Sequence, residues 1–179
     1  PQHEGLAASD FLTALTLLAS FENHKVTGSA VGCKRKDVLR LTSVVYQQYA
    51  DRLEKAFENT ARFLNRQSVF RAYDLPYQTQ LIPLAVILAI LGHRFEQDAV
   101  RQKLSQWYWC GVFGEMYGGA NEARYAFDVP EMIDWIDEKE VLPRTIRDSN
   151  FAPLRLLSLQ TRLSAAYKGI HALLMQVGA

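Results

Sequence analysis

Residues 81–91 read Leu-Ile-Pro-Leu-Ala-Val-Ile-Leu-Ala-Ile-Leu, and every one of them is apolar. The run is shorter than the roughly 20 residues that an α-helix needs to cross a membrane, so it predicts a buried core helix and no membrane span. The helix is expected to begin near Thr79 or Gln80, which puts Pro83 in the first turn, where its missing N–H costs little. Gly92 is placed to end the helix.

On both sides of this run, apolar residues recur at the three- and four-residue spacing of amphipathic helices. In the clearest case, Thr42 and Ser43 offer caps for a long helix that reaches about Leu64. Its apolar positions are Tyr46, Tyr49, Ala50, Leu53, Phe57, Ala61 and Leu64. Strand patterns are almost absent. We therefore predict an all-α fold, in which residues 1–179 form a single irregular bundle of about seven or eight helices around the central apolar helix.

The composition is that of an ordinary globular domain. The chain has 179 residues, of which 49% are hydrophobic, and its formal net charge of +1 excludes a strong overall field toward nucleic acid or membrane. Cys33 and Cys110 are too far apart in sequence to suggest a metal-ligand pair or a disulfide framework, which is typical of a reducing, cytoplasmic compartment. Because the chain starts at Pro1 without a signal sequence, we interpret it as a fragment of a longer multidomain protein.

A search for catalytic motifs finds no HExxH, Walker loop, GxGxxG, GxSxG or local Cys/His pair. The four histidines lie in separate segments of the sequence and have no partner at i, i+4. They are His3, His24, His93 and His171. We therefore predict no catalytic residue, no metal site and no cofactor for this chain.

One pattern imitates a nuclease signature. Pro130-Glu131 and Asp137-Glu138-Lys139 follow the order of a proline–acid and an acid–x–lysine half, which hold a divalent metal when adjacent strands present them. Here both halves fall within one predicted helix. At the start of this helix Asp128 and Glu131 resemble a capping box, and Pro130 lies early in the first turn. We interpret these residues as a solvated helix.

Charge is distributed unevenly along the chain. The segment Lys34–Arg71 carries nine bases and four acids, and the segment Asp128–Glu140 carries six acids and one base. Bases on one helix face can contact DNA phosphates and make binding depend on salt. The candidates are Lys34, Arg35, Lys36, Arg62, Arg66 and Arg71. Alternatively, these charges are simply solvated, or the two segments dock on each other.

Residues 104–124 form the most distinctive stretch, Leu-Ser-Gln-Trp-Tyr-Trp-Cys-Gly-Val-Phe-Gly-Glu-Met-Tyr-Gly-Gly-Ala-Asn-Glu-Ala-Arg. The three aromatic residues 107–109 either stack on nucleic-acid bases or belong to the core. Gly118 and Gly119 are expected to break the helix, and Asn121 to begin the next. Glu122 and Arg124 are expected to form a buried pair that fixes this turn.

Several runs, taken in order, resemble the helical region of the Gmr-type restriction endonuclease family, which combines a ParB-like N-terminal domain with an HNH nuclease domain. The runs are Phe11–Leu18, Cys33–Leu39, Asp74–Leu84, Trp107–Trp109 with Tyr117–Arg124, and Leu159–Lys168. The resemblance implies a helical segment between the two catalytic domains. The family's acid-Gly-Gln-Gln-Arg motif and its HNH motif are absent here, so the resemblance assigns no catalytic residue to this chain.

The resemblance and the charge pattern together lead to an expected function. We expect a non-catalytic helical domain that connects the flanking domains of a modification-dependent DNA endonuclease. It would contact double-stranded DNA through the basic side chains of the segment Lys34–Arg71. Any nucleotide or divalent metal would be used by the parent protein, outside this chain. The alternative is a protein-interaction or oligomerisation module, whose acidic helix Asp128–Glu140 meets a partner chain.

Overall fold

Helix α4, Leu81–Leu91, lies at the centre of the fold and confirms the predicted core helix. Every residue from Ile82 to Ala89 is buried, because α1, α3 and α6 pack around it. Gly92 follows with a φ of 54° and ends the helix, as expected. The computed structural model describes residues 7–119, 121–139, 142–152, 154 and 164–178.

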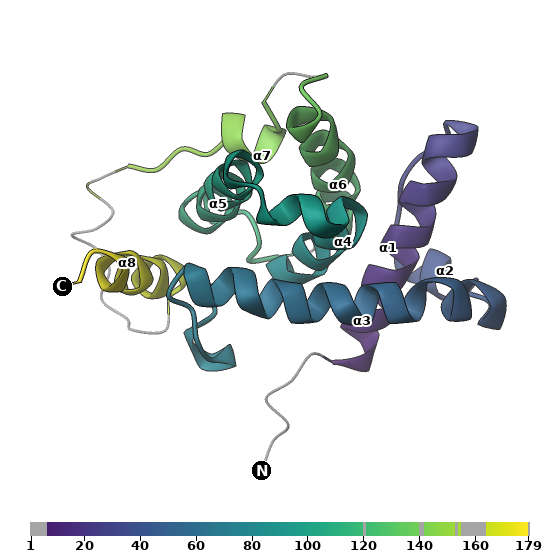
Figure 1. The fold of residues 1–179 in the computed structure, drawn as a ribbon, viewed down its shortest axis with the longest axis horizontal. Coiled ribbons are helices and arrows are strands. Elements are labelled where there is room, and N and C mark those ends of the chain that lie inside the picture. Colours follow the sequence, from purple (N-terminus) through teal and green to yellow (C-terminus); the bar gives the residue numbers. More distant parts are fainter. Residues whose placement is uncertain (1–6, 120, 140–141, 153, 155–163, 179) are drawn as a thin grey trace, which may run out of the picture.

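The described residues form eight α-helices and three short 3-10 helices, and contain no strand, which confirms the all-α prediction (Figure 1). The α-helices are α1 Ala8–Thr27, α2 Arg35–Val38, α3 Ser43–Arg66, α4 Leu81–Leu91, α5 Asp98–Phe113, α6 Glu122–Ile136, α7 Arg144–Arg147 and α8 Ala165–Gln176. The 3-10 helices are η1 Ala72–Asp74, η2 Gln78–Gln80 and η3 Gly92–Glu96.

Helices α1 and α3 cross steeply and cover α4 from two sides (Figure 1). The middle of α1 is buried over five consecutive residues, Ala14–Leu18, so this part of the helix is enclosed on all sides. By contrast, α3 is amphipathic. Its start is capped as predicted, since the Thr42 hydroxyl accepts a hydrogen bond from the Val45 N–H at 3.3 Å.

The prediction that Gly118 and Gly119 break a helix is wrong in position, since α5 already ends at Phe113. The chain turns at Glu115, which adopts a left-handed φ of 54°. The Met116 N–H then bonds back to the Gly111 carbonyl at 3.0 Å, as in a Schellman motif. This motif normally has glycine in the left-handed position, and the glutamate there hides the helix end from sequence inspection.

The start of the next helix also differs from the prediction. Helix α6 begins at Glu122, so Pro130 lies in its interior and Asp128 is not a cap. The Asp128 carboxylate instead points into the core and accepts hydrogen bonds from Trp107 and Thr145. Asp128 therefore links α6 to neighbouring helices and does not cap a helix. Helix α6 continues through Pro130 without a break.

One described stretch, Gln78–Glu96, has the length and composition of a membrane span, but 61% of its most apolar window is buried inside the fold. The core helix of a soluble protein has the same properties. Since α4 occupies the middle of this stretch and is surrounded by other helices, we interpret it as such a core helix.

Candidate nucleic-acid interface

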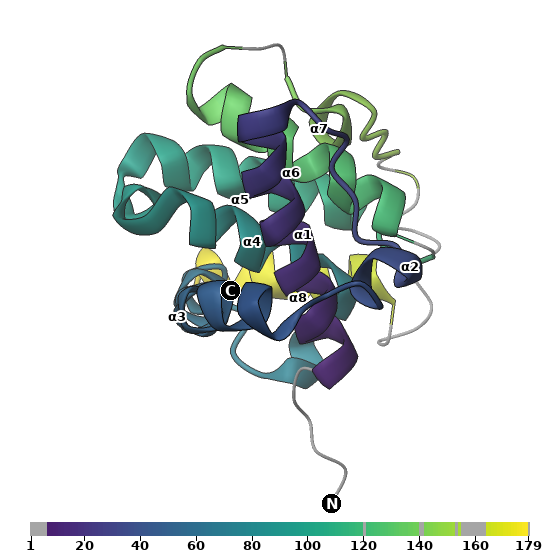
Figure 2. The ribbon, with the colours of Figure 1, turned by 90° about the vertical axis from the view of Figure 1, so that its right-hand side faces the viewer.

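The six basic candidates do not share one surface. Lys34, Arg35 and Lys36 are exposed at and just before α2. Figure 2 places α2 and α3 on opposite sides of α1. The bases on α2 therefore form a group of their own, apart from those at the end of α3.

Arg62 and Arg66 lie one turn apart near the C-terminus of α3, and both are exposed. The helix has 24 residues, or about 36 Å at roughly 1.5 Å per residue, so these arginines are far from its first turn. Acidic residues interrupt the exposed face between the two ends. They are Asp51, Glu54 and Glu58. Positive charge is therefore concentrated at the C-terminal end of the helix.

Beyond α3, residues 70–74 project from the surface between two buried anchors. Ser68 has a left-handed φ of 59°, which lets the Val69 N–H bond to the Leu64 carbonyl at 3.0 Å. Val69 and, further on, Leu75 are buried at 3% and 9% exposure. The segment between them, which we call the 70–74 segment, is held at both ends and extends outward.

Helix α8 lies opposite this segment, and the two enclose a groove of about 460 Å³. The Lys168 ammonium of α8 donates a hydrogen bond to the Leu75 carbonyl at 3.1 Å. It also lies 5.0 Å from the centre of the Tyr73 ring. The groove is lined by Ser68, Phe70, Arg71, Tyr73, Asp74, Tyr167, Lys168, His171, Ala172 and Met175.

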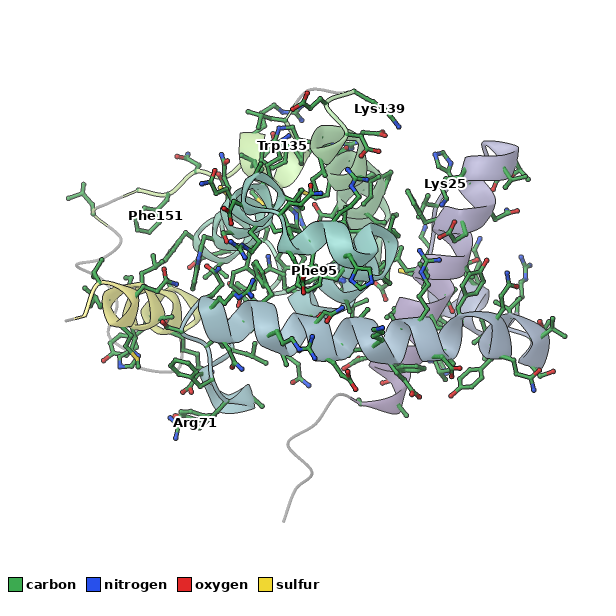
Figure 3. All side chains as sticks on the ribbon, in the orientation of Figure 1. Lys25, Arg71, Phe95, Trp135, Lys139 and Phe151 are labelled. Atoms are coloured by element: carbon green, nitrogen blue, oxygen red, sulfur yellow. The ribbon has the colours of Figure 1, made fainter. Side chains whose placement is uncertain are left out.

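The groove carries more basic than acidic groups. Arg71 projects below the C-terminal end of α3 (Figure 3) and pairs with Asp74, with Nε 3.0 Å and Nη2 3.2 Å from the carboxylate oxygens. These hydrogen bonds from Arg71 hold the pKa of Asp74 below its ordinary value. Lys168 adds a second cation from the far side of the groove.

A second groove separates the end of α3 from the start of α5. It measures about 620 Å³ and is lined by Phe63, Arg66, Gln67, Asp98, Arg101, Gln102 and Ser105. Gln67 bridges the two helices, because its amide donates to Ser105 Oγ at 2.9 Å and accepts from Trp109 Nε1 at 2.9 Å. Arg66 thus lies beside the Gln67 bridge between α3 and α5.

The aromatic run of α5 belongs to the core. Trp107 and Tyr108 are fully buried, and Tyr108 meets Phe63 of α3 edge to face with ring centres 5.9 Å apart. Trp109 is half-buried and donates a hydrogen bond to the side chain of Gln67. Of the two interpretations of this run, core packing is the one that the structure favours.

The distinctive stretch leads into a buried polar network centred on Asp128. Its carboxylate accepts hydrogen bonds from Trp107 Nε1 at 3.3 Å, from Thr145 Oγ1 at 2.6 Å and from the Tyr117 hydroxyl. Burial raises the pKa of Asp128, although these three donors oppose the shift. Burial also raises the pKa of Tyr117, and the neighbouring charge of Asp128 adds to it.

The expected pair between Glu122 and Arg124 does not form. Residues two apart on a helix point to different sides, so Glu122 is exposed while Arg124 turns inward. Arg124 donates to Thr145 Oγ1 at 3.1 Å and joins the Asp128 network. Gly118 and Gly119 follow the turn at Glu115, and neither has a positive φ.

Most described acids of the Asp128–Glu140 segment have partners within the chain. Glu131 accepts from the Arg144 side chain at 2.5 Å, and Asp137 pairs with Arg94 at 2.6 Å. Glu140 lies outside the described residues. The two halves of the nuclease-like pattern are thus spread along α6 and its end, and Glu131 and Asp137 form ion pairs there.

Within the described residues, no three His, Cys, Asp or Glu side chains gather in a way that could hold a metal ion. His3 and residues 159–163 of the last matching run lie outside the described part. Both cysteines are free thiols. Burial, with the charges of Glu122 and Asp37, raises the pKa of the Cys33 thiol to about 12, which makes it a poor nucleophile.

Four side chains that line the groove beside α8 could not be recognised as site residues from the sequence. They are Phe70, Tyr73, Lys168 and His171. No sequence pattern marks Phe70 and Tyr73, which fall in the short stretch before Asp74-Leu-Pro76. Lys168 contacts a carbonyl 93 residues earlier in the chain, and no local pattern could have signalled that contact.

Comparison with known proteins gives one partial match. No protein-family model and no solved structure matches the chain. The chain is similar to the uncharacterized protein MJ0686 of Methanocaldococcus jannaschii, with 27% identity over 78 residues. The match covers 41% of this chain and 13% of the archaeal protein.

Proposed function

We propose that this chain is a non-catalytic helical domain of a longer, DNA-acting protein, and that it contacts the backbone of double-stranded DNA. The resemblance to the Gmr-type endonucleases supports a connecting role between catalytic domains, which would themselves use any nucleotide and divalent metal. A cytoplasmic location goes with this role, and the two free thiols are in keeping with it.

The observation that carries the proposal is the concentration of exposed bases around the C-terminal end of α3. Arg62 and Arg66 lie one turn apart on the same exposed side of the helix, and the Arg62 guanidinium makes a long hydrogen bond of 3.4 Å to Asn59. Such a group can neutralise neighbouring phosphates and release counterions.

Fluorescence anisotropy with a short DNA duplex, titrated across salt concentrations, tests the proposal. We expect binding that weakens steeply with salt, and a double variant Arg62→Gln/Arg66→Gln that lowers the slope of log K against log salt by about 2, roughly 0.9 per lost phosphate contact. Lys139→Gln is the matched control, because Lys139 lies at the opposite edge of the molecule (Figure 3).

A triple variant Lys34→Gln/Arg35→Gln/Lys36→Gln measures what the separate group at α2 contributes. If the duplex bound only through α2, this variant would lose binding and the α3 double variant would not, which would contradict the assignment to α3. Absence of any binding at low salt would refute DNA contact altogether.

A second candidate function is docking of a partner or flanking domain. It is favoured by exposed apolar side chains in and beside the connection that leads from α2 to α3. Leu39 and Val44 are 77% and 70% exposed, and Tyr46 lies nearby at 40%. Contiguous exposed apolar groups often mark contact surfaces. Light scattering after chromatography tests self-association: a dimer that Val44→Lys dissociates would favour this function, and a monomer at all concentrations would exclude self-association.

A further inference from the structure

We propose that the groove between the 70–74 segment and α8 binds a phosphorylated nucleoside, with the base against Tyr73 and Phe70 and the phosphate beside Lys168 and Arg71. The proposal goes beyond duplex contact, because it concerns an aromatic groove and not the exposed arginines of α3. It can therefore hold or fail independently of duplex binding.

The aromatic side of the groove is built to stay exposed. Val69 and Leu75 are buried and fix both ends of the 70–74 segment, so Phe70 and Tyr73 cannot fold back into the core without pulling out these anchors. Both aromatic side chains are 58% exposed. Two such rings beside a cleft offer flat surfaces on which a base can stack whatever its identity.

The two cationic side chains, one on each side of the groove, are held in place before any ligand arrives. The Leu75 carbonyl fixes the Lys168 ammonium at 3.1 Å, and the Tyr73 ring lies under the same ammonium at 5.0 Å. Arg71 is oriented by its two hydrogen bonds to Asp74. Because Asp74 offsets part of the charge of Arg71, Lys168 is the principal phosphate contact, and the Asp74 carboxylate can accept from sugar hydroxyls.

The size of the groove suits this ligand. Its volume of about 460 Å³ falls within the roughly 300–1,000 Å³ of small-molecule sites. The lining contains aromatic, charged and apolar side chains, with Met175 and Ala172 on the α8 side. A bare anion would leave the rings unused, and a purely apolar ligand would make no use of the positive charge of Lys168. A phosphate joined to a planar base satisfies both.

The ligand can come from two sources, a free nucleotide or an unpaired nucleotide within single-stranded nucleic acid. Isothermal titration of the full chain with adenosine 5′-monophosphate, with a short single-stranded oligodeoxyadenylate and with inorganic phosphate separates them. Binding of the monophosphate supports a free nucleotide, and binding of the oligonucleotide alone supports a single strand. If neither binds, or if inorganic phosphate binds as tightly as the monophosphate, the proposal is overturned.

Variants then locate the site. We expect Tyr73→Ala to weaken binding by about 5- to 150-fold, the range of one lost base stack, and Lys168→Gln to weaken it while keeping the length of the side chain. Tyr73→Leu keeps apolar bulk without the ring and should behave like Tyr73→Ala. The control Lys139→Gln should bind normally, with all variants showing the wild-type circular dichroism. Unchanged affinity in Tyr73→Ala and Lys168→Gln would overturn the proposal even if the wild type binds.

Discussion

The hydroxyl of Tyr117 donates a hydrogen bond to the carboxylate of Asp128, and both side chains are buried. Trp107 of α5 and Thr145 of α7 donate to the same carboxylate. One acidic side chain of α6 therefore joins two other helices and the turn that follows α5. The aromatic residues Trp107 and Tyr117 of the distinctive stretch therefore serve packing and these hydrogen bonds.

Replacing Asp128 with alanine should destabilise the fold strongly. Trp107, Tyr117 and Thr145 would each lose an acceptor, and a buried unsatisfied polar group costs about 1–3 kcal/mol. We expect the free energy of unfolding to fall by at least about 3 kcal/mol, measured by urea denaturation. Asp51→Ala, on the exposed face of α3, is the control and should change it little. Equal effects of the two substitutions would contradict the role of the network.

The same carboxyl predicts how stability depends on pH. Its pKa is raised by burial above the ordinary value of 3.8. An acid of this kind contributes stability that is complete below its ordinary pKa and is lost as the pH rises through its folded-state pKa. We expect the free energy of unfolding of the wild type, relative to Asp128→Asn, to fall as the pH rises from below 3.8 toward neutrality. A pH-independent difference would argue against the shift.

Gly111 allows α5 to approach its neighbours closely. A Cβ atom there would lie 2.5 Å from Gln80 Nε2 and 2.7 Å from Tyr117 Cε2, and both of these side chains are buried. Gly111→Ala should lower the melting temperature, with a loss of about 1–3 kcal/mol from overpacking. At Gly119 an added Cβ meets nothing within 4 Å, so Gly119→Ala should be nearly neutral. If both were neutral, the close packing around Gly111 would be disproved.

Glu138 closes α6 in a left-handed conformation, with a φ of 58°. For residues other than glycine this conformation costs roughly 1–2 kcal/mol. We expect Glu138→Gly to be more stable than Glu138→Ala by about 1 kcal/mol, since both lack the carboxylate but only glycine relieves the strain. Chemical denaturation of the two variants measures the difference, and an alanine variant as stable as the glycine variant would refute it.

Most of the fold could be predicted from local patterns. The apolar run of α4 and the spacing of α3, with its Thr42 cap, depend on residues close together in sequence. The helix ends were harder to locate. At Ser68, Glu115 and Glu138 the chain turns through left-handed residues that are not glycine, so the usual sequence signal for a helix end is missing at each of them.

The candidate site was predicted only in part. Arg66 and Arg71 stood out because basic residues are visible in any sequence, whereas their companions depend on tertiary structure. Lys168 reaches the groove only because α8 packs on α5, where Gly169 leaves space for Val112 and Phe113. The role of Asp128 was likewise hidden, since its partners Trp107 and Thr145 come from two other helices.

The docking of α8 has a consequence for how the molecule is made. The Lys168 ammonium bonds to a carbonyl that precedes it by 93 residues. A ribosome therefore releases the 70–74 segment well before the helix that completes the groove. During synthesis, α1, α3 and α4 can assemble first, and the groove is completed only after α8 has been made. A nascent chain stalled before α8 would have most of its core and no groove.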